Sequence, residues 1–303
     1  MLDLKKYLIL LENSASHGLE IDNMMVLVHW LMLLLFMGWG VFFIYTLFKF
    51  NSYSNPKANY HGTKSHISSY TEVGVIIFEC VLIIGFAIPL WASLKTNIPE
   101  KADLEIRVVA QQFKWNIHYP GADGIFGQTD SKLINDSEGN FIGLDRNSIG
   151  GQDDIMVQDD LHLPVDKLVK IRLSSRDVIH SFSLPEMRVK QDAIPGMEIP
   201  IFFTPTMTSS EFLKRIKISD PKRYNGYFEF YKSEDFRKQF DSFPDNLKDK
   251  YRGYQIACAQ LCGNSHYKMR GFFTVESDLK FNQWLSSKAA LLIKDEEEED
   301  EDW

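Results

Sequence analysis

Four side chains that could bind a metal stand close together in the segment CAQLCGNSHYKM, which begins at Cys258. They are Cys258, Cys262, His266 and Met269, in the spacing Cys-x3-Cys-x3-His-x2-Met. Thiolates bind copper, zinc and iron–sulfur clusters, imidazoles bind copper and zinc, and a thioether ligand favours copper. Gly263 permits a tight turn directly after the second cysteine. A single loop can therefore surround a metal from several sides, and copper suits all three ligand types.

The second cysteine distinguishes between two kinds of copper site. A mononuclear blue-copper site uses two histidines, one cysteine and a weak axial methionine, so one cysteine here is surplus. Two thiolates on one loop can instead bridge two copper ions, each completed by one histidine and one weak ligand. This arrangement needs a second histidine from elsewhere. His180 is the best candidate, because it lies in the strand-like run VIHSFSLP and a loop between strands can bring it beside Cys258.

Other interpretations of these residues remain open from the sequence. A structural zinc site could use Cys258, Cys262, His266 and His180, although it leaves Met269 without a role. The cysteines could be a reduced, buried pair beside a hydrogen-bonded core histidine. A membrane-anchored protein that delivers or senses copper or zinc, with no oxidase role, is a further alternative. Such a protein needs exposed, labile ligands, whereas these ligands are expected on loops between strands.

Composition excludes several classes of protein. The chain has 303 residues with 33 Lys and Arg against 41 Asp and Glu, so it has no basic footprint for nucleic acid. It has three cysteines, too few for a disulfide framework at this length. Cys80 lies in an apolar run, where a lone cysteine behaves as a small hydrophobic residue.

Two apolar segments near the N-terminus predict a transmembrane hairpin. Residues from about 24 to 48 include no charged side chain, and those from about 73 to 94 include only Glu79. Each is long enough to cross a hydrocarbon core of about 30 Å. The connection between them carries Lys49, Lys57 and Lys64 with no carboxylate, which favours the cytoplasmic side. Both termini are then expected outside, on the periplasmic side of a bacterial inner membrane.

The elements that must position the metal ligands follow these spans. Residues 1–96 are expected to form an N-terminal segment and the hairpin, 97–294 an extramembrane domain, and 295–303 an acidic tail that resists folding. Short β-branched and aromatic runs predict a β-sandwich or barrel with strands at 106–119, 168–173, 178–184, 198–204, 254–259 and 271–275. Residues of about 121–154 and 206–252 interrupt this pattern and are expected as inserted loops, the second with a short helix at 233–240. A terminal helix is expected at 278–294.

The chain resembles subunit II of haem-copper cytochrome c oxidases, which carries the dinuclear copper A centre. The resemblance lies in the paired spans and in the motifs QQFKW, SSRDVIHSFSLP, QDAIPG and CAQLCGNSHYKM. It implies a cupredoxin-like sandwich that the hairpin holds against catalytic subunit I and other oxidase subunits. In that family the copper centre accepts electrons from a cytochrome c-type donor. It passes them to the haem-bearing subunit, which reduces O2 to water with proton translocation.

The same resemblance implies the set of copper ligands. Both cysteines, Cys258 and Cys262, would bridge two copper ions. One copper would add His180 and Met269, and the other would add His266 and the backbone carbonyl of Gln260.

Gln260 is a departure from the family, which usually has glutamate between the cysteines. There the glutamate carboxylate reaches a magnesium ion shared with the catalytic subunit. A neutral amide holds Mg²⁺ poorly compared with a carboxylate, so this chain argues against the magnesium contact. The copper ligand is retained because it is a backbone carbonyl.

The electron and proton paths of the family correspond to three further residues. Phe113 stands where members that accept electrons from soluble cytochrome c commonly have tryptophan, and Trp115 keeps the second aromatic position. This change indicates a different donor, such as a membrane-bound or fused cytochrome, and no CxxCH haem-attachment motif occurs in this chain. Glu72, before Pro89, matches a glutamate through which protons enter the catalytic subunit. A solvated carboxylate at a helix end is the alternative interpretation of Glu72.

Overall fold

The structure is a computed structural model that describes residues 10–57, 60–61, 65–96, 99–225 and 234–301, and the side chains of 234–237 and of residues after 290 fall outside that description. The chain divides into two compact units. The first comprises Met1–Leu10 and Leu19–Asn97, and the second comprises Leu11–Gly18 and Ile98–Trp303.

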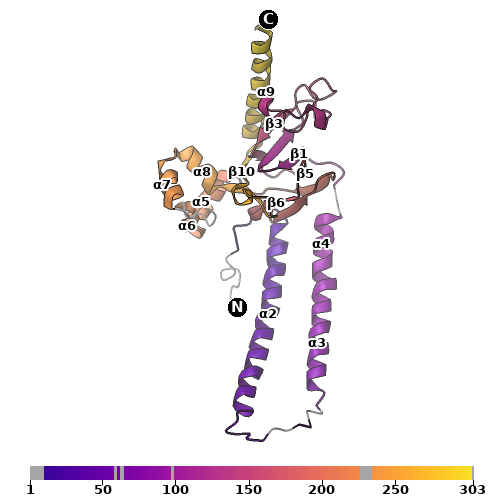
Figure 1. Cartoon of the computed structure of the whole chain (residues 1–303), viewed down its shortest axis with the longest axis vertical. Coiled ribbons are helices and arrows are strands. Elements are labelled where there is room, and N and C mark those ends of the chain that lie inside the picture. Colours follow the sequence, from indigo (N-terminus) through magenta and orange to yellow (C-terminus); the bar gives the residue numbers. More distant parts are fainter. Residues whose placement is uncertain (1–9, 58–59, 62–64, 97–98, 226–233, 302–303) are drawn as a thin grey trace. The chain divides into compact units, whose positions relative to one another are not determined.

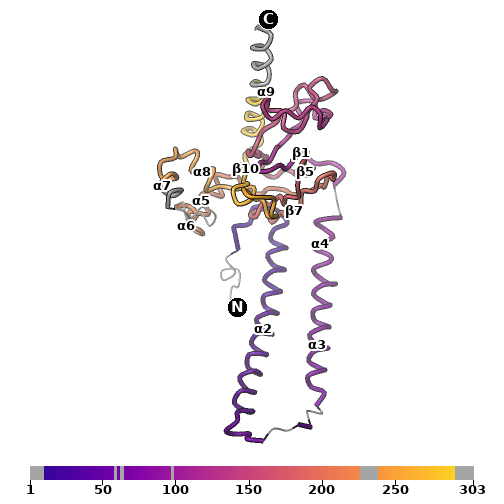
Figure 2. Tube along the Cα trace, in the orientation of Figure 1, coloured from indigo at the N-terminus to yellow at the C-terminus, as the bar shows by residue number. Residues whose placement is uncertain are grey.

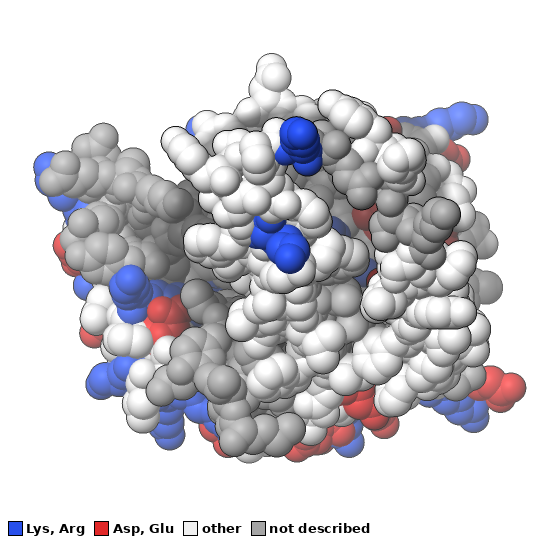
Figure 3. Space-filling model, turned by 90° about the horizontal axis from the view of Figure 1, so that it is seen from below, with Lys and Arg blue, Asp and Glu red and all other residues white. Residues whose placement is uncertain are grey.

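The first unit is a pair of long helices (Figure 1). The first is α2, Gly18–Lys49, and the second runs without a break through α3 (Ile67–Leu82), the π-helical turn η1 (Ile83–Ala87) and α4 (Ile88–Lys95). Both helices are long and apolar enough to cross a membrane. Figure 3 views the molecule from below and shows a largely uncharged surface at its centre, where only a few basic groups stand out. The predicted hairpin is confirmed, and each helix begins before its apolar run because its first turns are polar.

The second unit is a β-sandwich of two five-stranded sheets. One sheet has the order β3-β2-β1-β5-β8 and the other has the order β4-β10-β9-β6-β7. Adjacent strands are antiparallel except for the parallel pairs β1–β5 and β4–β10. The strands are β1 (Leu104–Gln111), β2 (Lys114–Tyr119), β3 (Ile155–Gln158), β4 (Asp160–Pro164), β5 (Val169–Ser175), β6 (His180–Leu184), β7 (Val189–Ala193), β8 (Ile199–Phe203), β9 (Tyr254–Cys258) and β10 (Arg270–Glu276).

The core lies between the two sheets. Alternate residues of β1, including Ile106 and Val108, are fully buried, as the two-residue period of a strand requires when one face meets a core. Side chains from the other sheet, among them Phe182 and Ile256, are equally buried and belong to the same cluster. The predicted all-β sandwich is therefore confirmed.

The expected strand at 106–119 is two strands in the structure. β1 ends at Gln111 and β2 begins at Lys114, with a tight turn between them. The two strands pair in an antiparallel hairpin in which Ala110 lies opposite Trp115. No glycine, proline or asparagine marks this turn, so the residue pattern of QQFKW looks continuous.

The two insertions differ in structure. Residues 121–154 form a loop region with the 3-10 turns η2 (Ser131–Leu133) and η3 (Asp136–Glu138), as expected for a loop. The loop is held to β2 by buried Asp154, whose Oδ2 lies 2.6 Å from His118 Nε2 and accepts from the backbone N–H of Gly127 at 2.8 Å. These contacts fix the loop without a regular sheet or helix.

The second insertion is mostly helical, which corrects the expectation of a loop with one short helix. It contains α5 (Ser209–Ser219), α6 (Pro221–Tyr224), α7 (Glu234–Ser242) and α8 (Asp245–Arg252), which gather beside β10 (Figure 1). Thr208 and Glu211 form a reciprocal capping box at the start of α5. Helix α5 buries Phe212 and Ile216, so its mixed charges mark one solvated face of an amphipathic helix.

The C-terminal helix is longer than predicted. α9 runs from Asp278 to Glu301, so the backbone of the acidic tail is helical up to that residue and the expected disorder was wrong. The acidic side chains of the tail lie outside the described part of the chain. Figure 2 draws this end of the trace in grey. Near its start, α9 stacks the ring of Trp284 on His162 of β4, with ring centroids 4.1 Å apart.

A short N-terminal segment belongs to the second unit, whereas the sequence placed all of residues 1–96 with the hairpin. The backbone N–H of Ser14 donates to the carbonyl of Glu186, and that of Thr206 donates to the carbonyl of Ser14, both at 2.9 Å. Ala15 forms a β-bridge with Pro205 and is 2% exposed. Leu11–Gly18 thus acts as an additional extended segment on the sandwich.

Candidate metal centre

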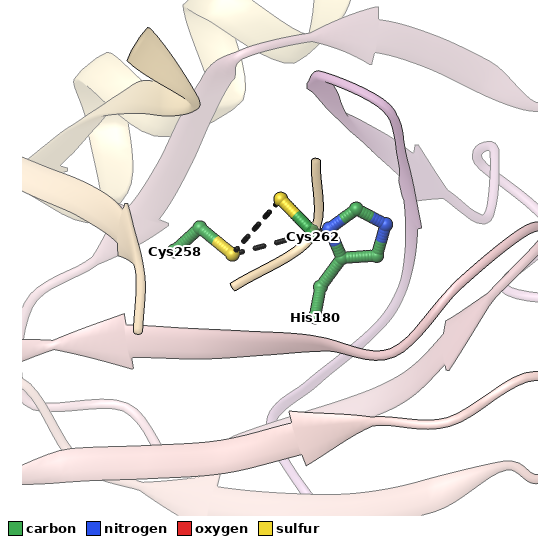
Figure 4. A group of neighbouring side chains, drawn as sticks. All are labelled: His180, Cys258 and Cys262. Carbon is green, nitrogen blue, oxygen red and sulfur yellow. Dashed lines mark hydrogen bonds between the residues drawn. The ribbon is translucent and has the colours of Figure 1, made fainter. Parts of the chain in front are cut away.

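Three potential ligands meet at one end of the sandwich. The nearest ligand atoms of His180, Cys258 and Cys262 all lie within 4.8 Å of one another. The two sulfur atoms are 3.8 Å apart, and Nδ1 of His180 lies 3.9 Å from the sulfur of Cys258. Figure 4 shows the imidazole and both thiols directed toward one another. His180 is fully buried and Cys262 is 4% exposed, whereas Cys258 is half-buried, so the cluster lies at the edge of the core.

Strand pairing brings the two sequence segments together. His180 is the first residue of β6, and Cys258 is the last residue of β9. β6 and β9 are neighbours with Phe182 opposite Cys258, and the backbone N–H of Ala259 donates to the carbonyl of Ser181 at 2.9 Å. The strand ends therefore fix the relative positions of the histidine and the first cysteine.

The remaining predicted ligands come from the loop between β9 and β10. Nδ1 of His266 lies 3.4 Å and Sδ of Met269 lies 3.8 Å from the sulfur of Cys262. The carbonyl oxygen of Gln260 lies 3.2 Å from the sulfur of Cys258. Met269 is 1% exposed although it lies at the end of a loop. The structure thus places the other four predicted ligand groups within 3.9 Å of one of the two sulfurs.

Two residues that support this cluster were not predicted from the sequence. The carboxylate of Asp177 accepts a hydrogen bond from Nε2 of His180 at 2.8 Å and another from the backbone N–H of Gln112 at 2.7 Å. The side-chain amide of Gln112 in turn donates to the backbone carbonyl of Cys262. Gln112 and Asp177 therefore connect the histidine segment to the cysteine loop. Such partners of a ligand orient it and tune its basicity.

Gly263 lets the cysteine loop approach the turn between β1 and β2. Its φ is +136°, a conformation that residues with a side chain rarely adopt. A Cβ atom at this position would lie 2.8 Å from Nε2 of Gln112 and 3.2 Å from the ring of Phe113. Gly263 therefore permits close packing against Phe113 in addition to the predicted tight turn.

The protonation of the two thiols is unequal. Burial acts to raise the pKa of Cys258, but hydrogen bonds from His180 and with backbone groups of Ser181 and Gln260 outweigh it and lower that pKa to about 6. Burial, and then the negative charge of Cys258, raise the pKa of Cys262 to about 12. Burial acts to lower the pKa of His180, yet its contacts with Cys258 and Asp177 raise it overall. The two pKa values are therefore displaced in opposite directions, downward for Cys258 and upward for Cys262.

The two aromatic residues of QQFKW lie at different depths. Trp115 is fully buried and meets the ring of His180 edge-on, with centroids 6.2 Å apart, and that of Phe182 at 5.3 Å. Phe113 is half-buried and lies against Gly263 of the cysteine loop. Both contact the cluster, so their predicted role in an electron path remains a prediction with compatible geometry.

The proposed proton entrance belongs to the other unit. Glu72 lies on α3 and is exposed, as is Glu79. The two residues are seven positions apart, which places them two turns apart on the same face of the helix. The role of Glu72 stays a prediction.

The comparison with protein families agrees with the fold. A family model described as cytochrome C oxidase subunit II, periplasmic domain, matches residues 104–209. Over these residues the chain therefore resembles the periplasmic domain of cytochrome c oxidase subunit II. The matched residues include His180 and Asp177 and end before Cys258, so the cysteine loop has to be judged on its own geometry.

Curated relatives carry the same name. The chain is 27% identical over 275 residues to the alternative cytochrome c oxidase subunit 2 of Bradyrhizobium diazoefficiens, which covers 90% of this chain and 82% of the relative. It is 30% identical over 177 residues to cytochrome c oxidase subunit 2 of Cyanidium caldarium, covering 55% and 61%. It is 27% identical over 192 residues to a heme-copper oxidase subunit 2 of Aeropyrum pernix, covering 56% and 68%.

Among solved structures, the chain is similar to the periplasmic domain of subunit II of the cytochrome oxidase of Bradyrhizobium japonicum. The identity is 23% and the TM-score is 0.37, and the match covers 64% of this chain and 99% of that domain. The family model and the curated relatives are both named for subunit II of cytochrome c oxidase, and copper is the metal that this family implies.

Proposed function

We propose that this chain is the subunit through which electrons enter a haem-copper terminal oxidase, and that its extramembrane domain holds a dinuclear copper A centre. The observation that carries the proposal is the pair of sulfur atoms 3.8 Å apart, with His180 and His266 near different members of the pair. Each cysteine has its own imidazole, so the donors are arranged as two similar sets around a shared pair of thiolates. A mononuclear copper site uses one cysteine and does not need two such sets of donors.

The residues fit copper better than zinc. Cys258 and Cys262 would bridge the metals, His180 and Met269 would complete one set, and His266 with the Gln260 carbonyl would complete the other. The buried thioether of Met269 lies 3.8 Å from the Cys262 sulfur, where a zinc site built from the cysteines and histidines would leave it without a function. Bound there, the two copper ions would supply rapid one-electron transfer with little change of geometry.

The protein's own contribution is to hold the ligands in fixed positions. His180 is fixed by its strand position and by Asp177, and Cys262 is fixed by burial and by the hydrogen bond from Gln112 to its carbonyl. Metal binding requires both thiols to be deprotonated, so the raised pKa of Cys262 makes binding weaker as the pH falls. The burial of His180, Cys262 and Met269 also argues against a protein that delivers or senses metal, because such a protein needs labile ligands.

The sidedness of the domain follows from its connections. Both the segment before α2 and the segment after α4 lead into the second unit, so two spans return the chain to the side on which it began. The lysines between the helices favour the cytoplasm for the connecting loop. The copper domain would then face the periplasm, and subunit I with other oxidase subunits would cover the exposed helices. The electron donor would be a cytochrome c-type protein that is membrane-bound or fused to a partner.

Counting copper in the full-length chain tests the proposal. The chain is purified in detergent with copper, and copper and zinc are measured per polypeptide for the wild type, Cys258→Ser and Cys80→Ser. We expect two copper ions in the wild type and in Cys80→Ser, because Cys80 lies on α3 outside the cluster. Cys258→Ser should lose the pair. One copper per wild-type chain, or stoichiometric zinc in preference to copper, would contradict the dinuclear assignment.

A further inference from the structure

A polar pocket is lined in part by Lys268 and Arg270, the residues that flank the ligand Met269. It has a volume of about 450 Å³ and lies between the ends of β2, β4 and β10 and helix α8. Its charged lining consists of Lys114, Asp159, Asp160, Lys250, Lys268 and Arg270. Tyr251 and Phe272 form an apolar part of its wall, with ring centroids 5.1 Å apart.

Cations outnumber carboxylates among these lining residues, by four to two. Two of the cations face the two carboxylates directly: Lys114 lies 2.8 Å from Asp159, and Lys250 lies 3.0 Å from Asp160. Arg270 donates to the neutral side-chain oxygen of Gln255 at 2.8 Å. The lining therefore carries a positive excess, whereas the whole chain has a formal net charge of −8. A local reversal of sign of this kind attracts an oppositely charged partner to one place.

The pocket is built from the same segments as the candidate electron path. Lys268 and Arg270 flank the ligand Met269, and Lys114 stands between Phe113 and Trp115. The backbone N–H of Trp115 donates to Oδ1 of Asp159 at 2.8 Å, and the backbone N–H of Asp159 donates to the carbonyl of Trp115 at 2.9 Å. The lining residue Asp159 is thus hydrogen-bonded to Trp115, whose ring meets that of His180 with centroids 6.2 Å apart.

The ligand loop also exposes two large apolar side chains. Leu261 is 80% exposed and Tyr267 is 67% exposed, and both lie between the metal ligands in sequence. Large exposed apolar side chains beside a charged pocket are typical of a surface that meets another protein. The pocket and the loop together therefore fit a macromolecular partner better than a free inorganic anion.

We propose that this pocket is the docking site for an acidic patch on the electron donor, so that the donor is recognised by carboxylates that meet Lys114, Lys250, Lys268 and Arg270. The inference rests on the proposed electron-transfer function and adds the charge of the partner to it. Attraction between the pocket and such a patch would orient the donor toward the ligand loop and raise the association rate. The inference concerns only the docking of the donor.

The first test uses the intact wild-type oxidase and needs no variant. Stopped-flow reduction of the oxidase is measured with a basic cytochrome c and with the same cytochrome c whose lysines have been succinylated. We expect the acidic, succinylated donor to react faster at low ionic strength, and its second-order rate to fall as salt is added, because salt screens the attraction. A faster reaction with the basic donor at low ionic strength would overturn the inference.

The second test changes the pocket. Lys268→Glu and, separately, Lys250→Glu should lower the rate with the succinylated donor by roughly tenfold at low ionic strength. Lys190→Glu is the control, since it makes the same charge change on β7, three strands from β10 in the sheet order. Unchanged rates in both pocket variants, or equal losses in the control, would overturn the docking site.

Copper content separates this inference from the proposed function. Lys268 lies on the ligand loop, so each variant is checked for copper per chain. If Lys268→Glu has lost copper, the rate of Lys250→Glu on α8 is the deciding measurement. A wild-type chain without the copper pair contradicts the proposed function. A wild-type chain with the pair and a preference for the basic donor contradicts only the docking inference.

Discussion

The side chain of Asp177 accepts a hydrogen bond from Nε2 of His180 at 2.8 Å, and this contact decides which imidazole nitrogen faces the cysteines. Nε2 keeps its proton for Asp177, so Nδ1, which lies 3.9 Å from the sulfur of Cys258, is the nitrogen left to bind a metal. Asp177 is itself held by the backbone N–H groups of Gln112 and Val178 at 2.7 and 2.6 Å. The carboxylate of Asp177 thus orients the ligand His180 and is not itself a predicted ligand.

Removing this carboxylate should loosen copper without unfolding the domain. Asp177→Ala leaves Nε2 of His180 without its acceptor, and loss of such a partner lowers metal affinity by roughly 10- to 100-fold. Asp177→Asn keeps a side-chain oxygen that can accept the bond, so it should retain most of the affinity. Copper affinity is measured by competition with a chelator. Equal affinity in the wild type and Asp177→Ala would show that the contact has no positioning role.

Gly263→Ala tests whether the ligand loop needs its close approach to the β1–β2 turn. The added methyl group would meet Gln112 and Phe113 in a backbone conformation that disfavours side chains, so we expect a loss of about 2 to 3 kcal/mol in stability together with weaker copper retention. Gly196→Ala is the matched control. Its φ is +77°, but nothing lies within 4 Å of the added atom, so it should cost about 1 kcal/mol and leave copper in place. Thermal unfolding and copper content are the measurements, and equal effects of the two substitutions would contradict the packing argument.

The residues that touch the metal could be predicted because their types and spacing carry the chemistry. Cys258, Cys262, His266 and Met269 stand on one loop, and His180 was selected as the histidine near a strand end. Gln112 could not be selected in this way, because it is 150 residues from Cys262 and meets it only through the sandwich. Asp177 did offer a signal, three positions before His180, but its role depends on the bend that precedes β6.

The fold was predictable where one face of an element is apolar and less so elsewhere. The hairpin and the sandwich follow from long apolar runs and short alternating ones. The helices of residues 206–252 were missed because their buried faces are short and their composition is highly charged, although the capping pair Thr208 and Glu211 was a readable start signal. The pairing of Leu11–Gly18 with the sandwich had no local pattern, because a single β-bridge needs none.

Gln260→Glu should introduce a magnesium contact and leave copper unchanged. In the family that this chain resembles, a carboxylate at this position reaches magnesium, whereas a neutral amide binds the ion poorly. The Gln260 contact with the Cys258 sulfur is made by the backbone carbonyl, which the substitution keeps. The measurement is Mn²⁺ bound per oxidase, with Mn²⁺ in place of magnesium. Tight Mn²⁺ binding at this position in the wild type would contradict the expectation.

Glu72→Ala should slow proton uptake by the intact oxidase if this carboxylate is the proton entrance. Proton uptake during turnover is followed with a pH indicator in solution, and a general acid–base group of this kind contributes about 100-fold or more when it is obligatory. Glu79→Ala is the control, since it removes a carboxylate two turns away on the same face of the helix. Unchanged proton uptake in Glu72→Ala, or an equal loss in Glu79→Ala, would exclude a specific role for Glu72.

The paired sulfurs of Cys258 and Cys262 are the centre of this account, and an electron paramagnetic resonance spectrum tests them most directly. The full-length chain is loaded with copper in detergent and adjusted to the state with one unpaired electron per site. We expect a hyperfine pattern in which that electron is shared equally between two copper nuclei. A pattern from a single copper nucleus would contradict the dinuclear centre.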